Sequence, residues 1–139
     1  MRKYIIEGGR RIEGELSAHG SKNAALPILA ASMLTRGTVL YNCPNLSDVN
    51  AACAILTHLG CNVRRGQNQV EVLPTNSDSH DIPDNLMREM RSSIVFLGAI
   101  IARHGKARVS LPGGCDALRR IIAKIGGAVL SCTTPPSAL

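Results

Sequence analysis

The sequence has few aromatic residues and no long apolar run. Aromatic residues make up 2% of the 139 residues and Trp is absent, so the core must be built mainly from Ala, Ile, Leu and Val. The longest apolar stretch, residues 94–102, contains Gly98 and is too short to span a bilayer. These features argue against a protein embedded in a membrane, and we expect no membrane partner.

The sequence also lacks a C-x-x-C motif, and its five cysteines are an odd number. Structural zinc sites usually need closely spaced cysteines, and disulfide frameworks usually need an even number of them. We therefore expect no metal and no cofactor. Thiols that stay reduced are typical of the cytoplasm, and the N-terminal residues lead into a strand-like run and not into a signal peptide. A cytoplasmic location is the expectation.

No basic tract is present, although the net charge is +6. The 16 Lys and Arg residues stand singly or in pairs, as at Arg64–Arg65 and Arg119–Arg120. Proteins that bind nucleic acid usually combine a basic stripe with aromatic side chains that stack on bases, and this sequence has neither. Scattered cations are better suited to small anionic ligands, so we expect no nucleic-acid partner.

Hydrophobic periodicity divides the chain into short strands and apolar helices. Strands are expected at residues 3–7, 11–17, 38–42, 62–65, 69–73, 106–111 and 128–131. Helices are expected at residues 22–34, 48–59, 84–104 (with a break near Arg91) and 116–125. Residues 132–139 are expected to form an unstructured tail.

The order of these elements repeats along the chain. Three pairs of turn residues lie the same number of residues apart: Gly37 and Gly105, Pro44 and Pro112, Asp48 and Asp116. Equal spacing of this kind indicates two copies of one helix-strand-helix-strand unit. The first helix of each copy is apolar on nearly all sides, whereas the strands alternate, so the helices should be buried on most sides and the sheets should lie outside. We predict an α/β fold with this inside-out layering and two repeats, at about 22–73 and 84–131.

Two cationic residues lie at the starts of the two apolar helices. Lys22 and Asn23 follow Gly20-Ser21 at a predicted helix N-terminus, where free N–H groups and the helix dipole favour an anion. Arg91 occupies nearly the equivalent place in the second copy. The pattern predicts a phosphate or carboxylate site, and exposed cations at helix starts are the alternative interpretation.

Cys115 follows a Pro-Gly-Gly turn, whose residues can adopt backbone angles that others cannot. Arg119 and Arg120 come one helical turn later, so the thiol is a candidate reactive group. A small buried side chain is the alternative interpretation of this cysteine.

Four motifs make the chain resemble a known family. They are G-S-K-N-A-A-L-P at 20–27, P-N-L-S-D-V at 44–49, M-R-S-S-I at 90–94 and L-P-G-G-C at 111–115. In this order and spacing they are similar to the N-terminal part of the UDP-N-acetylglucosamine 1-carboxyvinyltransferases, the enolpyruvyl transferases that open peptidoglycan synthesis. The resemblance implies βαβαββ units with buried helices. It also implies that residues 1–20 are strands belonging to another domain, and that residues 21–131 are part of an enolpyruvyl transferase domain.

The resemblance also implies roles for individual residues. Lys22 and Asn23 would contact phosphoenolpyruvate, and Arg91 would contact UDP-N-acetylglucosamine. Cys115 would donate a proton to C3 of phosphoenolpyruvate and would be the residue that fosfomycin alkylates. The implied reaction transfers enolpyruvate to the 3-hydroxyl of the sugar by addition and elimination of phosphate. This is the first committed step of peptidoglycan synthesis and is needed for cell shape and division.

The sequence departs from the family after Cys115. The family continues with a segment x-I-G-x-R-P, whereas Asp116 follows directly here, so the role of the family's arginine is not carried over to Arg120. The family enzyme is also far longer, and its later part supplies the other domain and an aspartate that acts on the sugar hydroxyl. We expect no turnover by this chain alone. The alternative is a non-catalytic remnant that binds a ligand or self-associates. A 3-phosphoshikimate 1-carboxyvinyltransferase is a further alternative, which the P-G-G-C motif disfavours.

Overall fold

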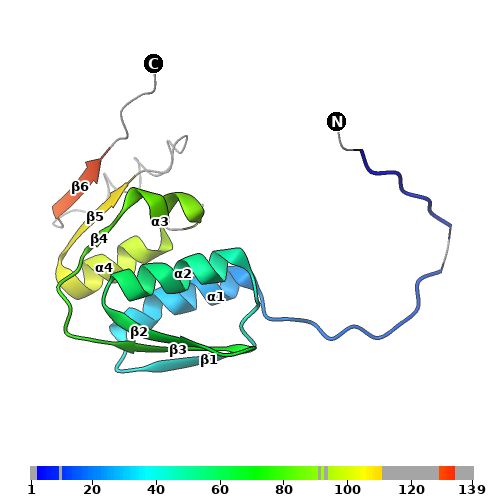
Figure 1. The fold of residues 1–139 in the computed structure, drawn as a ribbon, viewed down its shortest axis with the longest axis horizontal. Helices are drawn as coiled ribbons and strands as arrows, with labels where there is room; N and C mark the ends of the chain where they lie inside the picture. The colour runs from blue at the N-terminus through cyan, green and yellow to red at the C-terminus, as the bar shows by residue number, and fades with distance from the viewer. Residues whose placement is uncertain (1–2, 10, 91, 93, 111–128, 134–139) are drawn as a thin grey trace, which may run out of the picture.

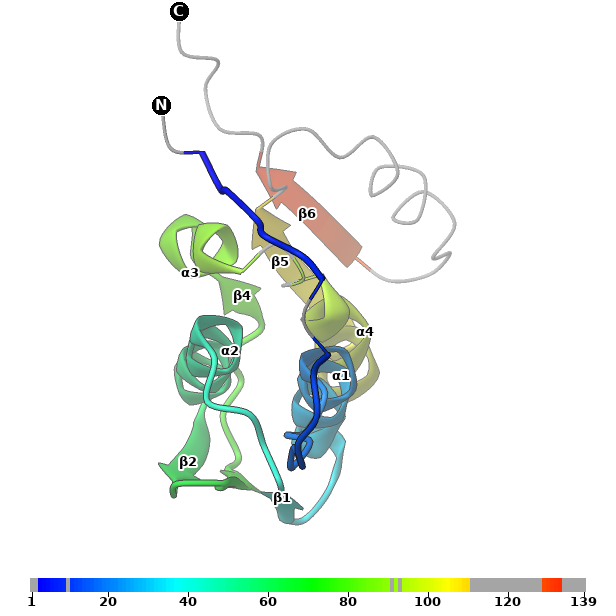
Figure 2. The same ribbon diagram turned by 90° about the vertical axis from the view of Figure 1, so that its right-hand side faces the viewer.

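The computed structural model describes residues 3–9, 11–90, 92, 94–110 and 129–133. From Lys22 onward the elements form three layers, with helices between two three-stranded sheets (Figures 1 and 2). The order of these layers confirms the predicted α/β fold with helices inside and sheets outside. Arg91, Cys115, Arg119 and Arg120 lie outside the described residues.

The first repeat supplies one sheet and two of the inner helices. Its elements are α1 (Lys22–Ala31), the 3-10 helix η1 (Ser32–Leu34), β1 (Thr38–Tyr41), α2 (Ser47–His58), β2 (Cys61–Arg65) and β3 (Gln69–Pro74). The strands pair antiparallel in the order β1-β3-β2. Val70 and Val72 of the central strand are buried against the helices, whereas Tyr41 lies on the outer face with 70% of its surface exposed. The strands predicted at residues 62–65 and 69–73 are confirmed, and they pair as a hairpin.

The second repeat forms the other sheet. Its described elements are β4 (Asp81–Ile82), α3 (Asp84–Glu89), α4 (Val95–His104), β5 (Lys106–Ser110) and β6 (Val129–Thr133). The strands pair parallel in the order β4-β5-β6. Helix α4 ends at Gly105, whose φ of 69° is left-handed and is readily adopted by a glycine at a helix C-terminus. The predicted break between α3 and α4 is confirmed.

The core is almost entirely aliphatic, as the composition predicts. Its largest fully buried side chains include Leu26 and Leu29 of α1, Ile55 of α2 and Phe96 of α4. Phe96 is the sequence's one phenylalanine and is completely buried. Burial of these side chains between the two sheets is the main force that holds the layers together.

One arginine joins the two repeats where α1 and α4 end. The guanidinium of Arg103, in α4, donates from Nη1 to the carbonyl oxygen of Met33 at 3.0 Å and from Nη2 to the carbonyl oxygen of Thr75. Met33 lies in η1, directly after α1. Helices α1 and α4 therefore end close together, and they run in the same direction (Figure 1).

Three expectations need correction within the described residues. Residues 3–9 and 11–19 form an extended, exposed arm and no strand (Figure 1), because a strand needs a paired neighbour and no described segment lies beside them. Helix α1 is buried on one face only, since Ile28 is 44% exposed. Strand β6 runs through Thr133, two residues into the predicted tail, because its backbone pairs with β5.

Candidate functional site

The predicted anion site lies at the start of α1. Ser21 occupies the N-cap, and its carbonyl oxygen accepts hydrogen bonds from the N–H groups of Ala24 and Ala25 at 3.3 and 2.9 Å. The first N–H groups of a helix have no partner within the helix, and they point outward with the positive end of the dipole. Lys22 and Asn23 are the first two residues of α1, so their N–H groups are placed to meet an anion.

The ammonium of Lys22 is ion-paired with a carboxylate from the next helix. Its Nζ lies 2.6 Å from Oδ2 of Asp48, and the two side chains are 41% and 25% exposed. Asp48 lies in the first turn of α2, where an acidic side chain suits the helix dipole. The ion pair therefore brings the G-S-K-N motif and the P-N-L-S-D-V motif together at one end of the helical layer.

The sequence places Asp48 in the internal repeat and in the P-N-L-S-D-V motif, but it does not predict the contact with Lys22. The two residues are 26 positions apart, so no local pattern shows that they meet. The available signal was weaker: each residue belongs to a motif at the start of a helix, and both helices belong to the same repeat.

A close backbone approach fixes the segment that leads into α1. A Cβ placed on Gly20 would lie 1.9 Å from the carbonyl oxygen of Asn42, so no side chain fits there. Asn42 itself has a left-handed φ of 52°, and it directly follows β1. The glycine of the G-S-K-N motif is thus required to pack the start of α1 against the end of β1.

The N-termini of three inner helices lie at the same end of the molecule. Lys22 and Asp48 place the starts of α1 and α2 side by side, and the Arg103 contact shows that α1 and α4 end together. Figure 1 shows α4 running in the same direction as α1. Three positive dipole ends therefore point toward one region, where they favour binding of an anion.

The remaining predicted site residues are placed only in part. Asn23 is exposed beside Lys22 and can donate its side-chain amide to a ligand. Arg91 and Cys115 lie outside the described residues. Arg91 falls between α3 and α4 in the chain, so it precedes the helix whose N-terminus faces the same end as Lys22.

Three other cysteines have the properties of structural thiols. Burial raises the pKa of Cys43 and of Cys53, and the nearby Arg65 guanidinium opposes this only in part. Burial likewise raises the pKa of Cys61, against an opposing effect of Arg103. These thiols stay protonated at neutral pH and are poor nucleophiles.

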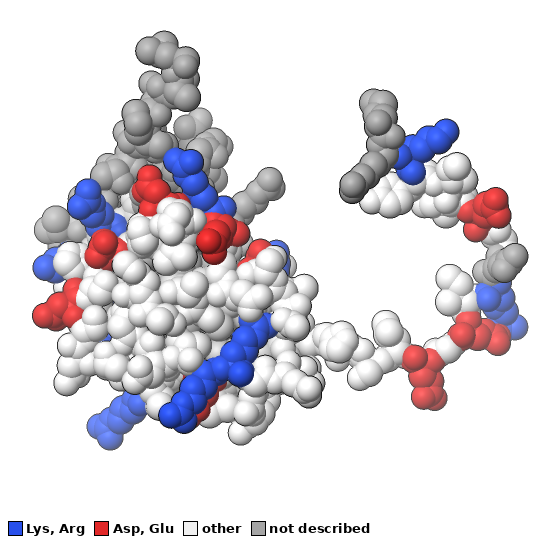
Figure 3. Space-filling model, viewed as in Figure 1, with Lys and Arg blue, Asp and Glu red and all other residues white. Residues whose placement is uncertain are grey.

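Charge and metal-ligating groups are dispersed in the described part of the chain. On the face shown in Figure 3, Lys and Arg side chains stand among Asp and Glu side chains. No group of three or more His, Cys, Asp or Glu side chains among the described residues could hold a metal ion. Within the same residues, no helix is long and apolar enough to cross a membrane.

A family model for EPSP synthase (3-phosphoshikimate 1-carboxyvinyltransferase) matches residues 6–128. The chain belongs to this family. Two curated relatives of this EPSP synthase-family chain carry a more specific name. This chain is 50% identical over 117 residues to UDP-N-acetylglucosamine 1-carboxyvinyltransferase 2 of Caldanaerobacter subterraneus subsp. tengcongensis. It is 48% identical over 116 residues to UDP-N-acetylglucosamine 1-carboxyvinyltransferase of Desulfosudis oleivorans.

These matches cover most of this family member but a minor part of each relative. They span 84% and 83% of this chain and 28% of each of the two relatives. The crystal structure of the enolpyruvyl transferase NikO from Streptomyces tendae is similar with a TM-score of 0.70 and 23% sequence identity, over 86% of this chain and 28% of that one. The structural likeness confirms the fold, and the curated relatives confirm the resemblance stated from the motifs.

Proposed function

We propose that this chain carries part of the active site of an enzyme that transfers enolpyruvate from phosphoenolpyruvate to the 3-hydroxyl of UDP-N-acetylglucosamine. The observation that carries the proposal is the position of Lys22 and Asn23 at the N-terminus of α1, where the N-termini of α1, α2 and α4 face the same way. The names of the relatives support the choice of substrates. The reaction places the protein in peptidoglycan synthesis, in the cytoplasm.

The start of α1 would bind phosphoenolpyruvate. Its phosphate and carboxylate are oxyanions, which accept charge-assisted hydrogen bonds from an ammonium, an amide and free helix N–H groups. Lys22 is already held by Asp48, so the incoming anion shares this ammonium with the carboxylate or replaces it. Asp48 thus fixes the direction in which Lys22 points before the ligand arrives.

Arg91 and Cys115 would complete the chemistry. Arg91 would bind UDP-N-acetylglucosamine. The 3-hydroxyl would lose its proton to the aspartate that the resemblance places in the later part of the family enzyme, and its oxygen would bond to C2 of phosphoenolpyruvate while the Cys115 thiol protonates C3. The C2–O bond to phosphate then breaks, and C3 loses a proton to the Cys115 thiolate as the C2=C3 double bond re-forms and the enol ether product is released. Cations that hold the phosphate stabilise the charge that develops on it.

Binding of phosphoenolpyruvate to the 139-residue chain tests the first half of this proposal. Calorimetric titration should show binding that the Lys22→Gln variant weakens by roughly tenfold or more. Lys3→Gln removes an exposed lysine of the arm and is the matched control. Equal affinity of the wild type and Lys22→Gln would contradict the assignment of Lys22.

Alkylation by fosfomycin tests the role of Cys115. Intact-mass measurement should show one adduct on the wild type and none on Cys115→Ser, because Cys43, Cys53 and Cys61 are structural thiols with raised pKa values. Cys132→Ser, which removes the fifth cysteine, should keep the single adduct. An adduct that persists in Cys115→Ser would contradict the assignment. The chain by itself should release no phosphate from the two substrates together, and turnover would contradict that expectation.

A non-catalytic module that self-associates is the second candidate. The arm exposes five large apolar side chains, each at least 79% exposed: Tyr4, Ile5, Ile6, Ile12 and Leu16. Helix α1 adds Ile28, and Leu34 of η1 is 52% exposed. Light scattering after size-exclusion chromatography should then show dimers or larger species, and Ile28→Glu should shift them toward the monomer. A monomer at all concentrations would contradict this candidate.

A further inference from the structure

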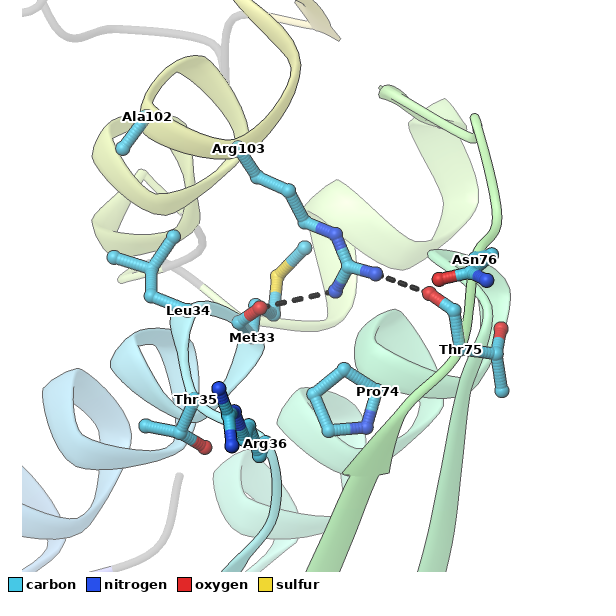
Figure 4. A pocket seen from close by; sticks show the side chains of 9 residues that line it. All are labelled: Met33, Leu34, Thr35, Arg36, Pro74, Thr75, Asn76, Ala102 and Arg103. Carbon is cyan, nitrogen blue, oxygen red and sulfur yellow. Dashed lines mark hydrogen bonds between the residues drawn. The ribbon is translucent and has the colours of Figure 1, made fainter.

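A polar cavity lies at the opposite end of α1 from Lys22. It has a volume of about 510 Å³ and opens between η1, the segment after β3 and the C-terminal end of α4 (Figure 4). Helix α1 has ten residues and is therefore roughly 15 Å long. The cavity is thus distinct from the proposed phosphoenolpyruvate site.

Arg103 brings a fixed positive charge to this cavity. Its guanidinium crosses the space from α4 and donates to the carbonyl oxygens of Met33 and Thr75 (Figure 4). Carbonyl groups are neutral, so these two partners hold the guanidinium in place without neutralising its charge. The side chain is half-buried, where its field is screened less than that of a fully exposed group.

Arg36 supplies a second guanidinium to the same cavity. It directly follows Thr35 at the end of η1 and is exposed, with no carboxylate of the described residues paired with it. Arg11 and Arg64, in contrast, are ion-paired with Glu13 and Glu71. Among the described residues that line the cavity there is no Asp or Glu, so the lining carries two formal positive charges and no negative one.

The rest of the lining favours an organic ligand. Leu34, Pro74 and Ala102 present apolar surface, and Asn76 brings a side-chain amide. The volume lies within the range of roughly 300–1,000 Å³ that is usual for small-molecule sites. An arginine can bind a phosphate or carboxylate through two parallel N–H donors, and an amide adds a further donor.

We propose that this cavity binds a small organic oxyanion, a phosphate monoester or a carboxylate. Arg36 donates paired hydrogen bonds to the oxyanion, Arg103 adds its fixed charge, and Asn76 donates from its amide. The apolar body of the ligand lies against Leu34, Pro74 and Ala102. The site is independent of the transferase assignment, since no residue is shared with the start of α1.

Titration of the ¹⁵N-labelled 139-residue chain with phenyl phosphate tests the site by NMR. Saturable shifts should appear at the amides of residues 34–36, 75–76 and 102–103. Benzoate should shift the same amides if the site accepts a carboxylate, and phenol, which has no charge, should not. Inorganic phosphate should bind more weakly than phenyl phosphate because it has no apolar body.

Three variants make the result decisive. Arg36→Gln, an exposed position where folding should be preserved, should weaken phenyl phosphate binding by roughly tenfold or more. Arg88→Gln removes an exposed arginine of α3 that does not line the cavity and should change nothing. Lys22→Gln should abolish shifts at the start of α1 and leave those at residues 34–36 intact. The proposal is overturned if Arg36→Gln binds as tightly as the wild type, or if the shifts in the wild type are confined to the start of α1.

Discussion

Nζ of Lys22 and Oδ2 of Asp48 lie 2.6 Å apart and join the first turns of α1 and α2. Both side chains remain partly exposed, so an incoming anion can reach the ammonium while it is still paired. The contact links two motifs that are separate in the sequence, and it makes Asp48 a positioning residue for the proposed phosphoenolpyruvate site.

Replacing Asp48 with Asn should strengthen the binding of phosphoenolpyruvate. Asn keeps a side-chain oxygen that can accept from Lys22 Nζ and so preserves the direction of the ammonium, but it removes the negative charge that competes with the ligand and repels it, so the affinity should rise by roughly fivefold. Calorimetric titration measures this, and Glu89→Gln, at an exposed position of α3, is the control. Weaker binding by Asp48→Asn would show instead that the direction of Lys22 matters more than the competing charge.

Replacing Phe96 with Ala should strongly destabilise the fold. The side chain is completely buried between the sheets, and its removal leaves a cavity in a core with no other phenylalanine. The free energy of unfolding should fall by about 3–5 kcal/mol. Urea denaturation followed by circular dichroism measures the loss. Val39→Ala, on the exposed outer face of β1, should cost below about 1 kcal/mol, and an equal loss in both variants would contradict the inside-out core.

Two glycine-to-alanine changes should act in opposite directions. Gly20→Ala places a Cβ against the carbonyl oxygen of Asn42, so it should reduce stability by about 1–3 kcal/mol and weaken binding at the start of α1. Gly98→Ala introduces a Cβ into open space within α4, so it should raise stability by roughly 0.5–1 kcal/mol. Thermal unfolding of both variants checks the pair, and a neutral Gly20→Ala would mean that the approach to Asn42 is not needed.

His104 should make the protein less stable in mild acid. Burial lowers the pKa of His104, and Arg103, His80 and Lys106 lower it further, while Asp78 opposes them. Its Nε2 is buried without a hydrogen-bond partner among the described residues. The unfolded chain, with a pKa near 6.5, then binds the proton more readily than the folded chain does. Stability is retained above that value and is lost as pH falls below it.

Replacing His104 with Gln isolates this effect. Urea denaturation at pH 7.5 and at pH 5.5 should show a smaller loss of stability in His104→Gln than in the wild type. His19→Gln, at an exposed histidine of the arm, should behave as the wild type. If His104→Gln loses as much stability as the wild type over this interval, His104 does not cause the loss.

The elements that could be predicted from the sequence are those whose patterns are local. The spacing of turn residues predicted the repeat, and the contrast between apolar helices and alternating strands predicted the order of the layers. The arm shows the limit of such patterns. Residues 3–7 and 11–17 alternate as strands do, yet whether they form strands depends on a partner far away in sequence or in another part of the protein.

In the candidate site, too, the residues that could be predicted are those with a local sequence pattern. Lys22 and Asn23 could be placed at a helix N-terminus because a local Gly-Ser sequence precedes an apolar helix. Asp48 could not be assigned to the site, because its contact with Lys22 depends on how α1 and α2 pack. The cavity around Arg36 and Arg103 depends likewise on three separate segments, and nothing in any one of them indicates it.

The lack of Trp has a practical consequence for spectroscopy. Tyr4 and Tyr41 are 94% and 70% exposed in the folded protein, so both phenol rings are already in water and unfolding barely changes their emission. Intrinsic fluorescence therefore hardly reports the folding of this chain. A Trp introduced in place of the buried Phe96 would turn the centre of the helical layer into an optical reporter, provided that the core accepts the larger ring.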